Sequence, residues 1–264
     1  MNFRRIYAIL LRQYYLQVDS KTRFISLFYW STVELFVWGV ITRYLVNLGG
    51  ANFKVLGILV GTVIFWNFFT RIQQGMTSAF LEDIWTRNLI NIFSSPITLG
   101  EYLTGLIFTS IITTLLAVFS MIVLAWVLFA YDIFQFGLYI VPFVAILFIF
   151  GWAMGIFATA AVLRMGPAAE IIVWSLPTFI MPFSGVFYPI STLPLLVQPF
   201  SYLLPTTYVF EGMREVIQGG VFLSNYFFTA LFLSLLYFIF SIALLYYVYG
   251  FIRKAGLFTR HMTS

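Results

Sequence analysis

The chain has 264 residues, of which 62% are hydrophobic and 9% charged, and its net charge is +5. Soluble domains have roughly 45–50% apolar and about 25% charged residues, so a soluble globular protein is excluded. The sequence has no cysteine, one histidine (His261) and no GxxxxGKS/T loop, which excludes disulfides, Cys or His metal clusters, a catalytic triad and ATP binding through that loop. We predict an all-α integral membrane protein.

Residues 1–23 predict a basic amphipathic helix on the membrane surface. Five apolar residues recur at helical spacing, Phe3, Tyr7, Leu10, Tyr14 and Val18. Arg4, Arg5 and Arg12 lie largely off that stripe. A solvated tail would expose the aromatic rings to water, and a signal peptide would have an uninterrupted apolar run, so an interfacial helix is favoured.

Six membrane spans are predicted within a single transmembrane domain, 1–264, because a hydrocarbon core about 30 Å thick takes about 20 apolar residues per helix. They cover residues 24–46, 54–75, 103–130, 136–163, 170–187 and 226–250. Two glycine pairs at i,i+4 spacing, Gly57/Gly61 and Gly151/Gly155, indicate close helix approach, within one chain in preference to between copies.

The basic residues predict that both termini, including the tail 251–264, are cytoplasmic. In that orientation eleven Lys and Arg lie inside, namely Arg4, Arg5, Arg12, Lys21, Arg23, Arg71, Arg87, Arg164, Arg253, Lys254 and Arg260. Three lie outside, Arg43, Lys54 and Arg214. This asymmetry follows the positive-inside rule, so the net charge reports membrane orientation and not nucleic-acid binding.

Residues 76–102, between the second and third spans, are predicted to be a cytoplasmic docking element. A helix that extends the second span is expected to carry the charged residues Glu82, Asp83 and Arg87. Pro96 should end this helix, because the residue before a proline avoids the helical conformation. A second short helix, from Ile97 to about Leu103, should lead into the third span. A plain connection would need only a few residues, which favours docking.

A proline-rich segment precedes the last span. Six of the nine prolines lie within 29 residues, Pro177, Pro182, Pro189, Pro194, Pro199 and Pro205. Proline removes a backbone donor, and an unpaired backbone group in lipid costs several kcal/mol. Residues 188–212 are therefore expected to enter from the outside, turn and return without spanning. Pro205 should begin an outer, partly wet helix that carries Glu211 and Arg214.

Glu34 lies inside the first predicted span, where a carboxylate costs a few kcal/mol. Two interpretations stay open. The carboxyl group is protonated or hydrogen-bonded at a helix contact, or it lines a transport pathway together with Trp30 and Trp38.

Two stretches resemble the permease subunit of ABC exporters of the type 2 family. One is SGVFYPISTLP at 184–194, followed by LLPTTY at 203–208 and EGMR at 211–214; the other is RNLINIFSSPITLGEYL at 87–103. The similarity covers nearly the whole chain, including its length, the number of spans and the N-terminal helix. Each motif is loose alone, but the two in this order are fairly specific.

The resemblance implies roles for several segments. Residues 94–101 would form a coupling helix seated in a cleft of the ATPase subunit, which assigns coupling to Ser94, Ser95, Pro96, Ile97, Thr98 and Glu101. The N-terminal helix would be an elbow, and the helix with Glu82, Asp83 and Arg87 a cytoplasmic gate helix. Residues 188–212 would cap the exit, and the residues assigned to this outer segment are Gly185, Tyr188, Pro189, Pro194, Pro205, Glu211 and Arg214.

The resemblance also implies an exporter in the cell inner membrane. ATP and Mg²⁺ would bind a separate ATP-binding cassette subunit, which carries the ATPase activity, and this transport subunit would hold no cofactor. A second permease copy would form a homodimer with it and complete the pathway. The substrate would be a lipid, a polysaccharide or a drug-like molecule. An alternative is an ion-gradient-driven transporter or channel with Glu34 as proton site, but no clear internal repeat is present. An intramembrane hydrolase is disfavoured, since no Asp pair or GxSxG occurs.

Overall fold

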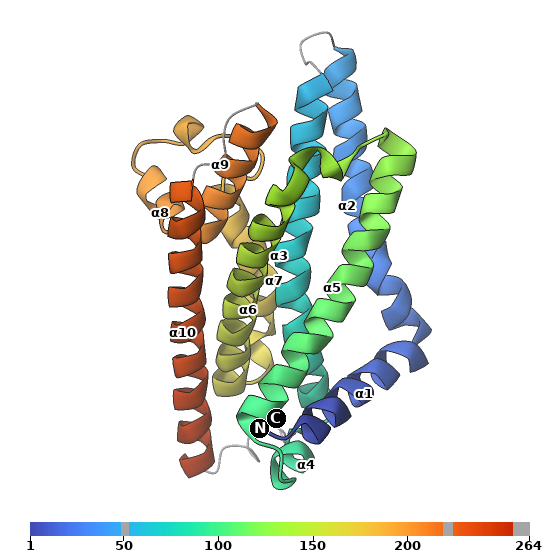
Figure 1. Ribbon diagram of the computed structural model, residues 1–264. Helices are drawn as coiled ribbons and strands as arrows, with labels where there is room; N and C mark the ends of the chain where they lie inside the picture. Colours follow the sequence, from blue (N-terminus) through green and yellow to red (C-terminus); the bar gives the residue numbers. More distant parts are fainter. Residues whose placement is uncertain (49–52, 219–223, 256–264) are drawn as a thin grey trace.

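The structure is a computed structural model that describes residues 1–48, 53–218 and 224–255. All regular elements within these ranges are helices (Figure 1). The helices are α1 (Phe3–Asp19), α2 (Lys21–Asn47), α3 (Phe53–Trp85), α4 (Leu89–Ser94), α5 (Leu99–Phe129), η1 (Ile133–Tyr139), α6 (Ile140–Met165), η2 (Pro167–Ala169), α7 (Glu170–Ile180), η3 (Met181–Phe183), η4 (Ile190–Thr192), α8 (Gln198–Tyr202), α9 (Pro205–Ile217) and α10 (Ser224–Ala255). The predicted tail, 251–264, lies outside the described residues from 256 onward.

Four segments are long and apolar enough to cross a membrane, namely Lys21–Asn47, Leu99–Phe129, Ile133–Met165 and Ser224–Lys254. They agree with the first, third, fourth and sixth predicted spans. Helix α3 has 33 residues but carries polar side chains such as Asn67, Arg71 and Gln73 in its interior. Helix α7 has only 11 residues, fewer than the roughly 20 that a straight span needs.

The fifth predicted span, 170–187, is too long. The α-helix ends at Ile180 and a 3₁₀ turn, Met181–Phe183, follows it. Pro182 lies in that turn, and a proline removes a backbone donor that a continuing helix would need. Beyond it, Gly185 adopts a left-handed conformation with φ of 63°, which directs the chain away from the helix axis.

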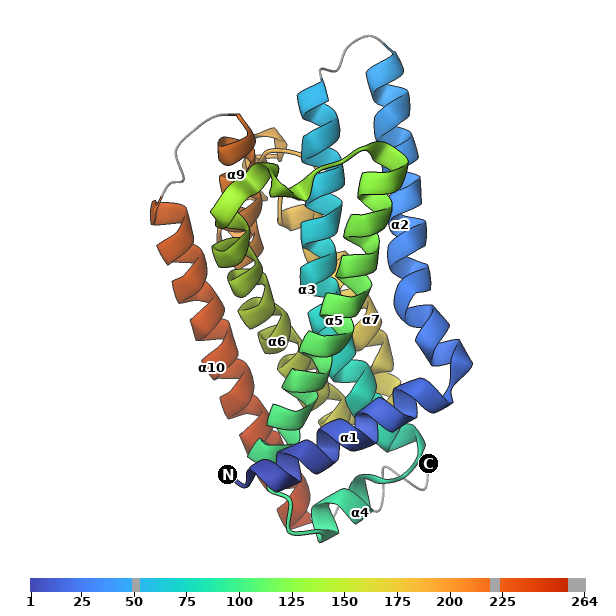
Figure 2. The same cartoon turned by 45° about the vertical axis from the view of Figure 1, so that its right-hand side comes forward.

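The helices form a bundle with two distinct ends. Helix α1 lies across one end beside α4, which we call the α1 end, whereas α8 and α9 lie at the opposite end, called the α9 end (Figures 1 and 2). Helix α6 packs most extensively against α10 and α3, and α5 packs against α3, α2 and α1. The proline-rich segment therefore lies far from α1 and α4.

The contact between α3 and α6 depends on Gly151. A Cβ atom on Gly151 would lie 1.9 Å from the Ile72 Cγ2 atom and 3.1 Å from the Phe69 carbonyl oxygen. Gly155, one turn on, faces the Gln73 carbonyl oxygen in the same way, at 3.3 Å. The expectation of close approach within one chain is thus confirmed for this pair, and the surroundings of Gly57 lie outside the description.

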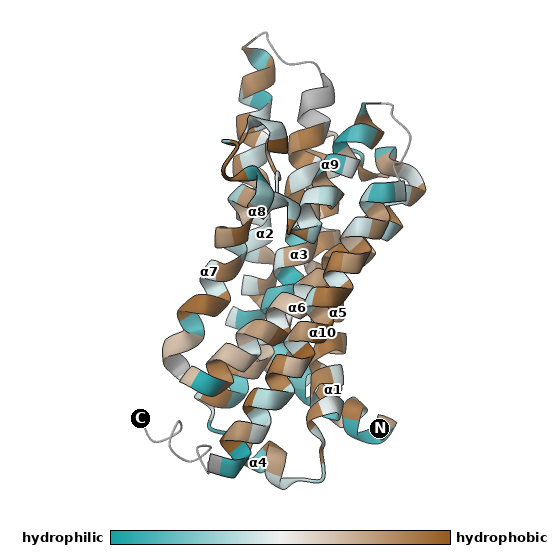
Figure 3. Cartoon of the chain, turned by 90° about the vertical axis from the view of Figure 1, so that its left-hand side faces the viewer, coloured by the Kyte–Doolittle hydropathy of each residue, from teal (hydrophilic) through white to brown (hydrophobic). Residues whose placement is uncertain are grey.

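The outer surface of the bundle is apolar over much of its length. Large side chains on three helices are exposed, including Phe36 on α2, Phe119 on α5 and Phe232 on α10. Hydrophobic residues dominate the middle of the bundle, and hydrophilic residues are more frequent toward its ends (Figure 3). Soluble proteins rarely expose such patches, so these faces contact lipid and the protein is a multi-pass membrane protein.

Candidate functional site

The α4 tip, residues 86–98, projects at the α1 end between α3 and α5. Helix α3 ends at Trp85, and the Asn88 amide donates to the Asp83 carbonyl oxygen (2.8 Å) while the Arg87 amide donates to that of Ile84 (2.9 Å). These two bonds form a Schellman motif, with Arg87 at the left-handed position that glycine usually occupies (φ 55°).

One part of the predicted gate helix is therefore wrong. Glu82 and Asp83 belong to α3, but Arg87 lies in the turn that follows it. The turn was hard to predict because the sequence has no glycine there. A non-glycine residue in this conformation costs about 1–2 kcal/mol locally, so the surrounding contacts must hold Arg87 in place.

The boundaries of the predicted coupling helix also differ. The short helix is Leu89–Ser94, residues 95–98 form an extended linker, and α5 runs unbroken from Leu99 to Phe129, so a separate helix from Ile97 to Leu103 is absent. Pro96 disfavours a helical Ser95, as predicted. The new helix then starts at a capping box: the Thr98 hydroxyl accepts from the Glu101 amide (3.3 Å), and the Glu101 carboxylate accepts from the Thr98 amide (3.0 Å).

Buried and exposed residues alternate along the α4 tip. Leu89 and Ile92 are buried against the bundle. The outward residues are exposed, namely Thr86, Arg87, Ile90, Asn91, Ser94, Pro96 and Thr98, while Ser95 and Ile97 are half-buried. The tip is thus fixed to α3 and α5 on one side and presents a mixed apolar and polar surface on the other.

Three ion pairs connect the N-terminal segment to the two helices that flank the tip. They join Arg5 to Glu101 (3.4 Å), Arg12 to Asp83, and Arg23 to Glu82 (2.6 Å). The Asn2 amide adds a hydrogen bond to Glu101 (2.7 Å). Helix α1 and the start of α2 are therefore bonded both to the last turns of α3 and to the first turn of α5.

Asp83 is at the centre of the most buried of these contacts. Its side chain is fully buried and accepts hydrogen bonds from Arg12 and from the Tyr102 hydroxyl (2.6 Å). Tyr102 is itself 1% exposed and packs against Phe93 of α4. The cluster connects α1, α3, α4 and α5 at one point.

Helix α1 uses both of its faces. The apolar stripe with Phe3, Tyr7 and Tyr14 is exposed, as expected of a helix lying on a membrane, whereas Ile6 and Ile9 pack against the bundle. Of the arginines next to the stripe, Arg5 and Arg12 form two of the ion pairs just described, and Arg4 is exposed. From the sequence, these arginines are predicted to be the basic side of an interfacial helix and a signal of orientation; the carboxylates that flank the tip were the missed signal for their pairing.

At the α9 end, each proline of residues 188–205 lies at the start of a short turn or helix, and Pro199 is the second residue of α8. The Pro189 carbonyl oxygen accepts from the Thr192 amide (3.0 Å) and that of Pro194 accepts from the Val197 amide (2.8 Å). Pro205 is the first residue of α9. None of these elements has more than 13 residues, so none reaches the length of a straight span.

Arg214 and Glu211 hold this outer segment together. The buried Arg214 guanidinium donates to the carbonyl oxygens of Gly185 and Val186 (3.1 Å for Val186). Glu211 accepts from the Ile190 amide (2.8 Å) and contacts Arg214 at 3.4 Å. Burial lowers the pKa of Arg214, and the Glu211 carboxylate opposes that shift. Both side chains thus fix backbone that has no helix of its own.

Two further contacts position the same segment. The Tyr188 hydroxyl donates to the Pro182 carbonyl oxygen (2.7 Å), which closes the loop after α7. Trp38 of α2 stacks on Phe187, with ring centroids 4.0 Å apart. Trp38 therefore contacts the outer segment, and its predicted place in a transport pathway stays a prediction.

Glu34 is half-buried between α2 and α3. Its carboxylate accepts from the Asn67 side-chain amide (3.0 Å), and the Ser31 hydroxyl donates to the Asn67 side-chain oxygen (3.2 Å). Arg71, one turn further along α3, acts on Glu34 through its charge. This hydrogen-bonded contact accounts for a carboxylate at that depth, whereas Trp30 is exposed and contributes no hydrogen bond to the cluster.

Comparison with known proteins gives one family. A family model described as ABC-2 type transporter matches residues 6–218 of this chain. The match includes α1, the α4 tip and the proline-rich segment. No curated protein matches the sequence.

Proposed function

Because the chain belongs to the ABC-2 type transporter family and is a permease subunit of an ABC-type transporter, we propose that it works as a dimer driven by a separate ATP-binding cassette subunit. The proposed cargo is a lipid, a polysaccharide or a drug-like molecule, moved outward across the cell inner membrane. ATP and Mg²⁺ would bind the ATPase, and this chain supplies the pathway and the coupling.

The observation that supports this proposal most directly is the construction of the α4 tip. It projects from the bundle, is fixed by Leu89 and Ile92, and presents Ile90 and Pro96 outward. In the proposed complex these outward residues, with Ser94, Ser95, Ile97 and Thr98 beside them, contact the ATPase. The resulting contact contains apolar side chains with a polar rim, as protein interfaces do.

The proposed coupling mechanism follows the ion pairs. When the ATPase subunits close on ATP, they displace the α4 tip, and α3 and α5 move with it. Arg12 on Asp83 and Arg5 on Glu101 transmit the same displacement to α1. Helix α2 starts directly after Ser20, so α1 changes the inclination of α2. The outer segment at the α9 end then opens the exit.

We further propose that α3 and α7 complete six spans and that both termini are cytoplasmic. The α1 end then faces the cytoplasm, and the α9 end faces outward with residues 188–212 as a re-entrant segment. In this arrangement α7 and the 3₁₀ turn after it would cross only part of the bilayer, and the outer segment would fill the remainder.

Cross-linking tests the coupling proposal without knowledge of the cargo. The chain has no cysteine, so a single introduced Cys reports one position. Ile90→Cys on the α4 tip is expected to cross-link to the copurified ATPase subunit with a maleimide–benzophenone reagent, which needs no thiol on the ATPase, because Ile90 is 39% exposed there. Phe134→Cys, exposed in η1 between α5 and α6, serves as the matched control and should give no product. A product from Phe134 and none from Ile90 would contradict the proposal.

Labelling in intact cells tests the orientation. Cys substituted for Ser191 or for Leu195, both exposed in the outer segment, is expected to react with a membrane-impermeant maleimide added outside. Ser201 is unsuitable because its side chain is fully buried. Asn91→Cys, at the α4 tip, should react only after the cells are opened. Labelling of Ser191→Cys only in opened cells would overturn the six-span arrangement.

A further inference from the structure

A pocket of about 380 Å³ lies between α1, α2, α3 and α5 at the α1 end. This is within the roughly 300–1,000 Å³ typical of small-molecule sites. Its apolar lining includes Phe24, Trp30, Ile112 and Leu116, all of which are largely exposed toward the lipid. A ligand there could keep an apolar tail among these side chains while its polar end reached into the pocket.

The inner part of the pocket has polar groups without partners. The Gln13 side chain is 6% exposed, and its amide nitrogen has no hydrogen-bond acceptor among the described residues. The Thr114 hydroxyl, fully buried in the same lining, has no partner there either. Neither atom has exposed surface, so both side chains must turn toward the pocket before a bound acceptor can recover the roughly 1–3 kcal/mol that a buried unsatisfied donor costs.

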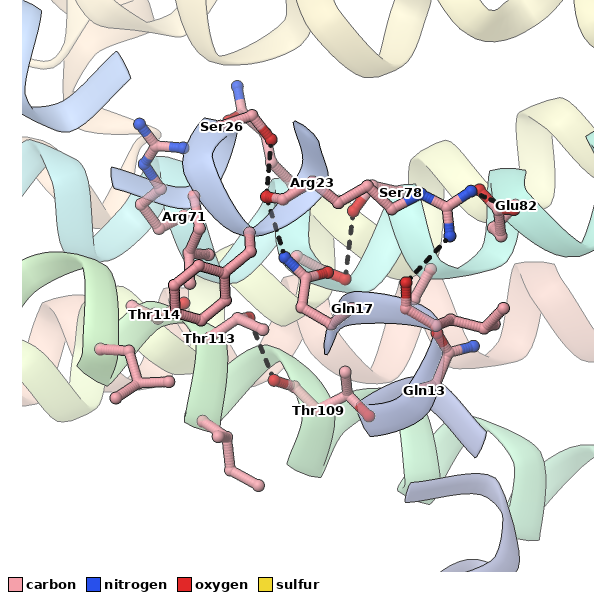
Figure 4. A pocket seen from close by; sticks show the side chains of 18 of the residues that line it. Gln13, Gln17, Arg23, Ser26, Arg71, Ser78, Glu82, Thr109, Thr113 and Thr114 are labelled. Atoms are coloured by element: carbon pink, nitrogen blue, oxygen red, sulfur yellow. Dashed lines mark hydrogen bonds and ion pairs between the residues drawn. The ribbon is translucent and has the colours of Figure 1, made fainter. Parts of the chain in front are cut away.

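The charge of the lining is positive. Of its three charged residues, Arg23 forms an ion pair with Glu82, which leaves Arg71. Within the described part of the chain no carboxylate lies within 4.0 Å of Arg71; Glu34 acts on it only at longer range and hydrogen-bonds to Asn67 instead. In Figure 4, Arg71 and Thr114 lie on one side of the view and Gln13 on the other.

We propose that this pocket binds the phosphate group of an anionic phospholipid. The phosphate oxygens accept from Arg71, from the Gln13 amide and from Thr114, and one acyl chain lies along Trp30, Ile112 and Leu116. Basic pockets between transmembrane helices commonly hold such headgroups. The site belongs to the leaflet at the α1 end, which is the cytoplasmic leaflet in the proposed orientation. The lipid proposal rests on the insertion of the chain in the membrane and does not depend on the proposed coupling to an ATPase.

The apolar side of the pocket suits the acyl chain of a lipid. The pocket is lined by α1 and α2, both of which expose aromatic rings to the bilayer, so a lipid could enter sideways without leaving the membrane. Free phosphate offers the same chemistry at the polar end but nothing to the apolar side. The lipid is therefore the occupant that satisfies both halves of the lining.

Tryptophan quenching tests the proposal. The six other tryptophans of the full chain are replaced by phenylalanine, so that Trp30 alone is observed. This chain is reconstituted in dioleoylphosphatidylcholine that contains brominated dioleoylphosphatidylglycerol or brominated dioleoylphosphatidylcholine. The quenching of Trp30 is expected to give phosphatidylglycerol a binding constant about tenfold higher than that of phosphatidylcholine. One charge-assisted contact would give a difference of about this size. Arg71→Gln should abolish this preference, and Gln13→Leu should weaken it. Arg71→Lys should keep part of it, because the positive charge remains.

Arg43→Gln is the matched control. Arg43 is exposed on the same helix as Trp30 but at the opposite end, so its loss should leave the preference unchanged. Equal quenching by both lipids in the unsubstituted chain, or a preference that survives Arg71→Gln, would overturn the proposal. Added inorganic phosphate should not displace the lipid: the quenching in phosphate should equal that in sodium chloride of the same ionic strength. Displacement by phosphate alone would identify a free anion as the ligand and would also overturn it.

Discussion

Asp83→Ala is expected to lower the free energy of unfolding by about 3 kcal/mol and to uncouple ATP hydrolysis from the permease. The substitution removes the acceptor of Arg12 and of the fully buried Tyr102 hydroxyl, which then has no partner in its surroundings. Arg12 is partly exposed and can turn to water, so most of the loss comes from Tyr102. Thermal unfolding of the detergent-solubilised complex measures the first effect.

The functional effect is measured as the ATPase rate of the complex relative to the ATPase alone. If Asp83 holds α1 to the α4 tip, the variant complex should hydrolyse ATP at the rate of the free ATPase subunit. Asp19→Ala is the matched control, since Asp19 is exposed at the end of α1 and forms no ion pair among the described residues. Unfolding of both variants at the same temperature, with coupling intact, would refute the role given to Asp83.

Arg214→Ala should have a comparable effect at the opposite end and lower the free energy of unfolding by about 2–4 kcal/mol. Two carbonyl groups lose their buried donor, and the Glu211 carboxylate loses its ion-pair partner. Residues 184–190 have few other backbone bonds, so the outer segment should loosen before the bundle unfolds. Hydrogen exchange followed by mass spectrometry would detect faster exchange in residues 184–192 and little change in α5 or α6.

Two variants separate the causes of that effect. Arg214→Lys keeps the charge but has a single donor group, so it should recover only part of the stability. Glu215→Ala removes a neighbouring exposed charge and is expected to change the stability by no more than about 0.5 kcal/mol. Protection of residues 184–192 that is the same in Arg214→Ala as in the unsubstituted chain would exclude the proposed role of Arg214.

Hydropathy was sufficient for four of the six predicted membrane helices, and the proline positions were sufficient for the short, broken elements of the proline-rich segment. Apolar runs long enough to cross a bilayer leave few alternatives, and within 188–205 Pro189, Pro194 and Pro205 do begin a turn or helix. Helix ends were less predictable. Arg87 occupies a left-handed position with no glycine to signal it, and the short helix came before Pro96 instead of across it.

The contacts of the candidate site could not be predicted for a different reason. Arg12 and Asp83 are separated by 71 residues, and Arg5 and Glu101 by 96. A charge pattern indicates which residues are available for pairing, but the pairing depends on how α1 crosses α3 and α5. The same holds for Asn67, which the sequence presents as one polar residue in an apolar run and which the structure brings to Glu34.

The contact of Glu34 with Asn67 also bears on how the chain is made. During synthesis α2 leaves the ribosome first, with a carboxylate that an isolated helix would carry into lipid at a cost of a few kcal/mol. Its hydrogen-bond donor and the nearby Arg71 both belong to α3, the next helix to emerge. The two helices should therefore enter the bilayer together as a hairpin, and a nascent chain arrested before Asn67 should integrate poorly unless Glu34 is replaced by Gln.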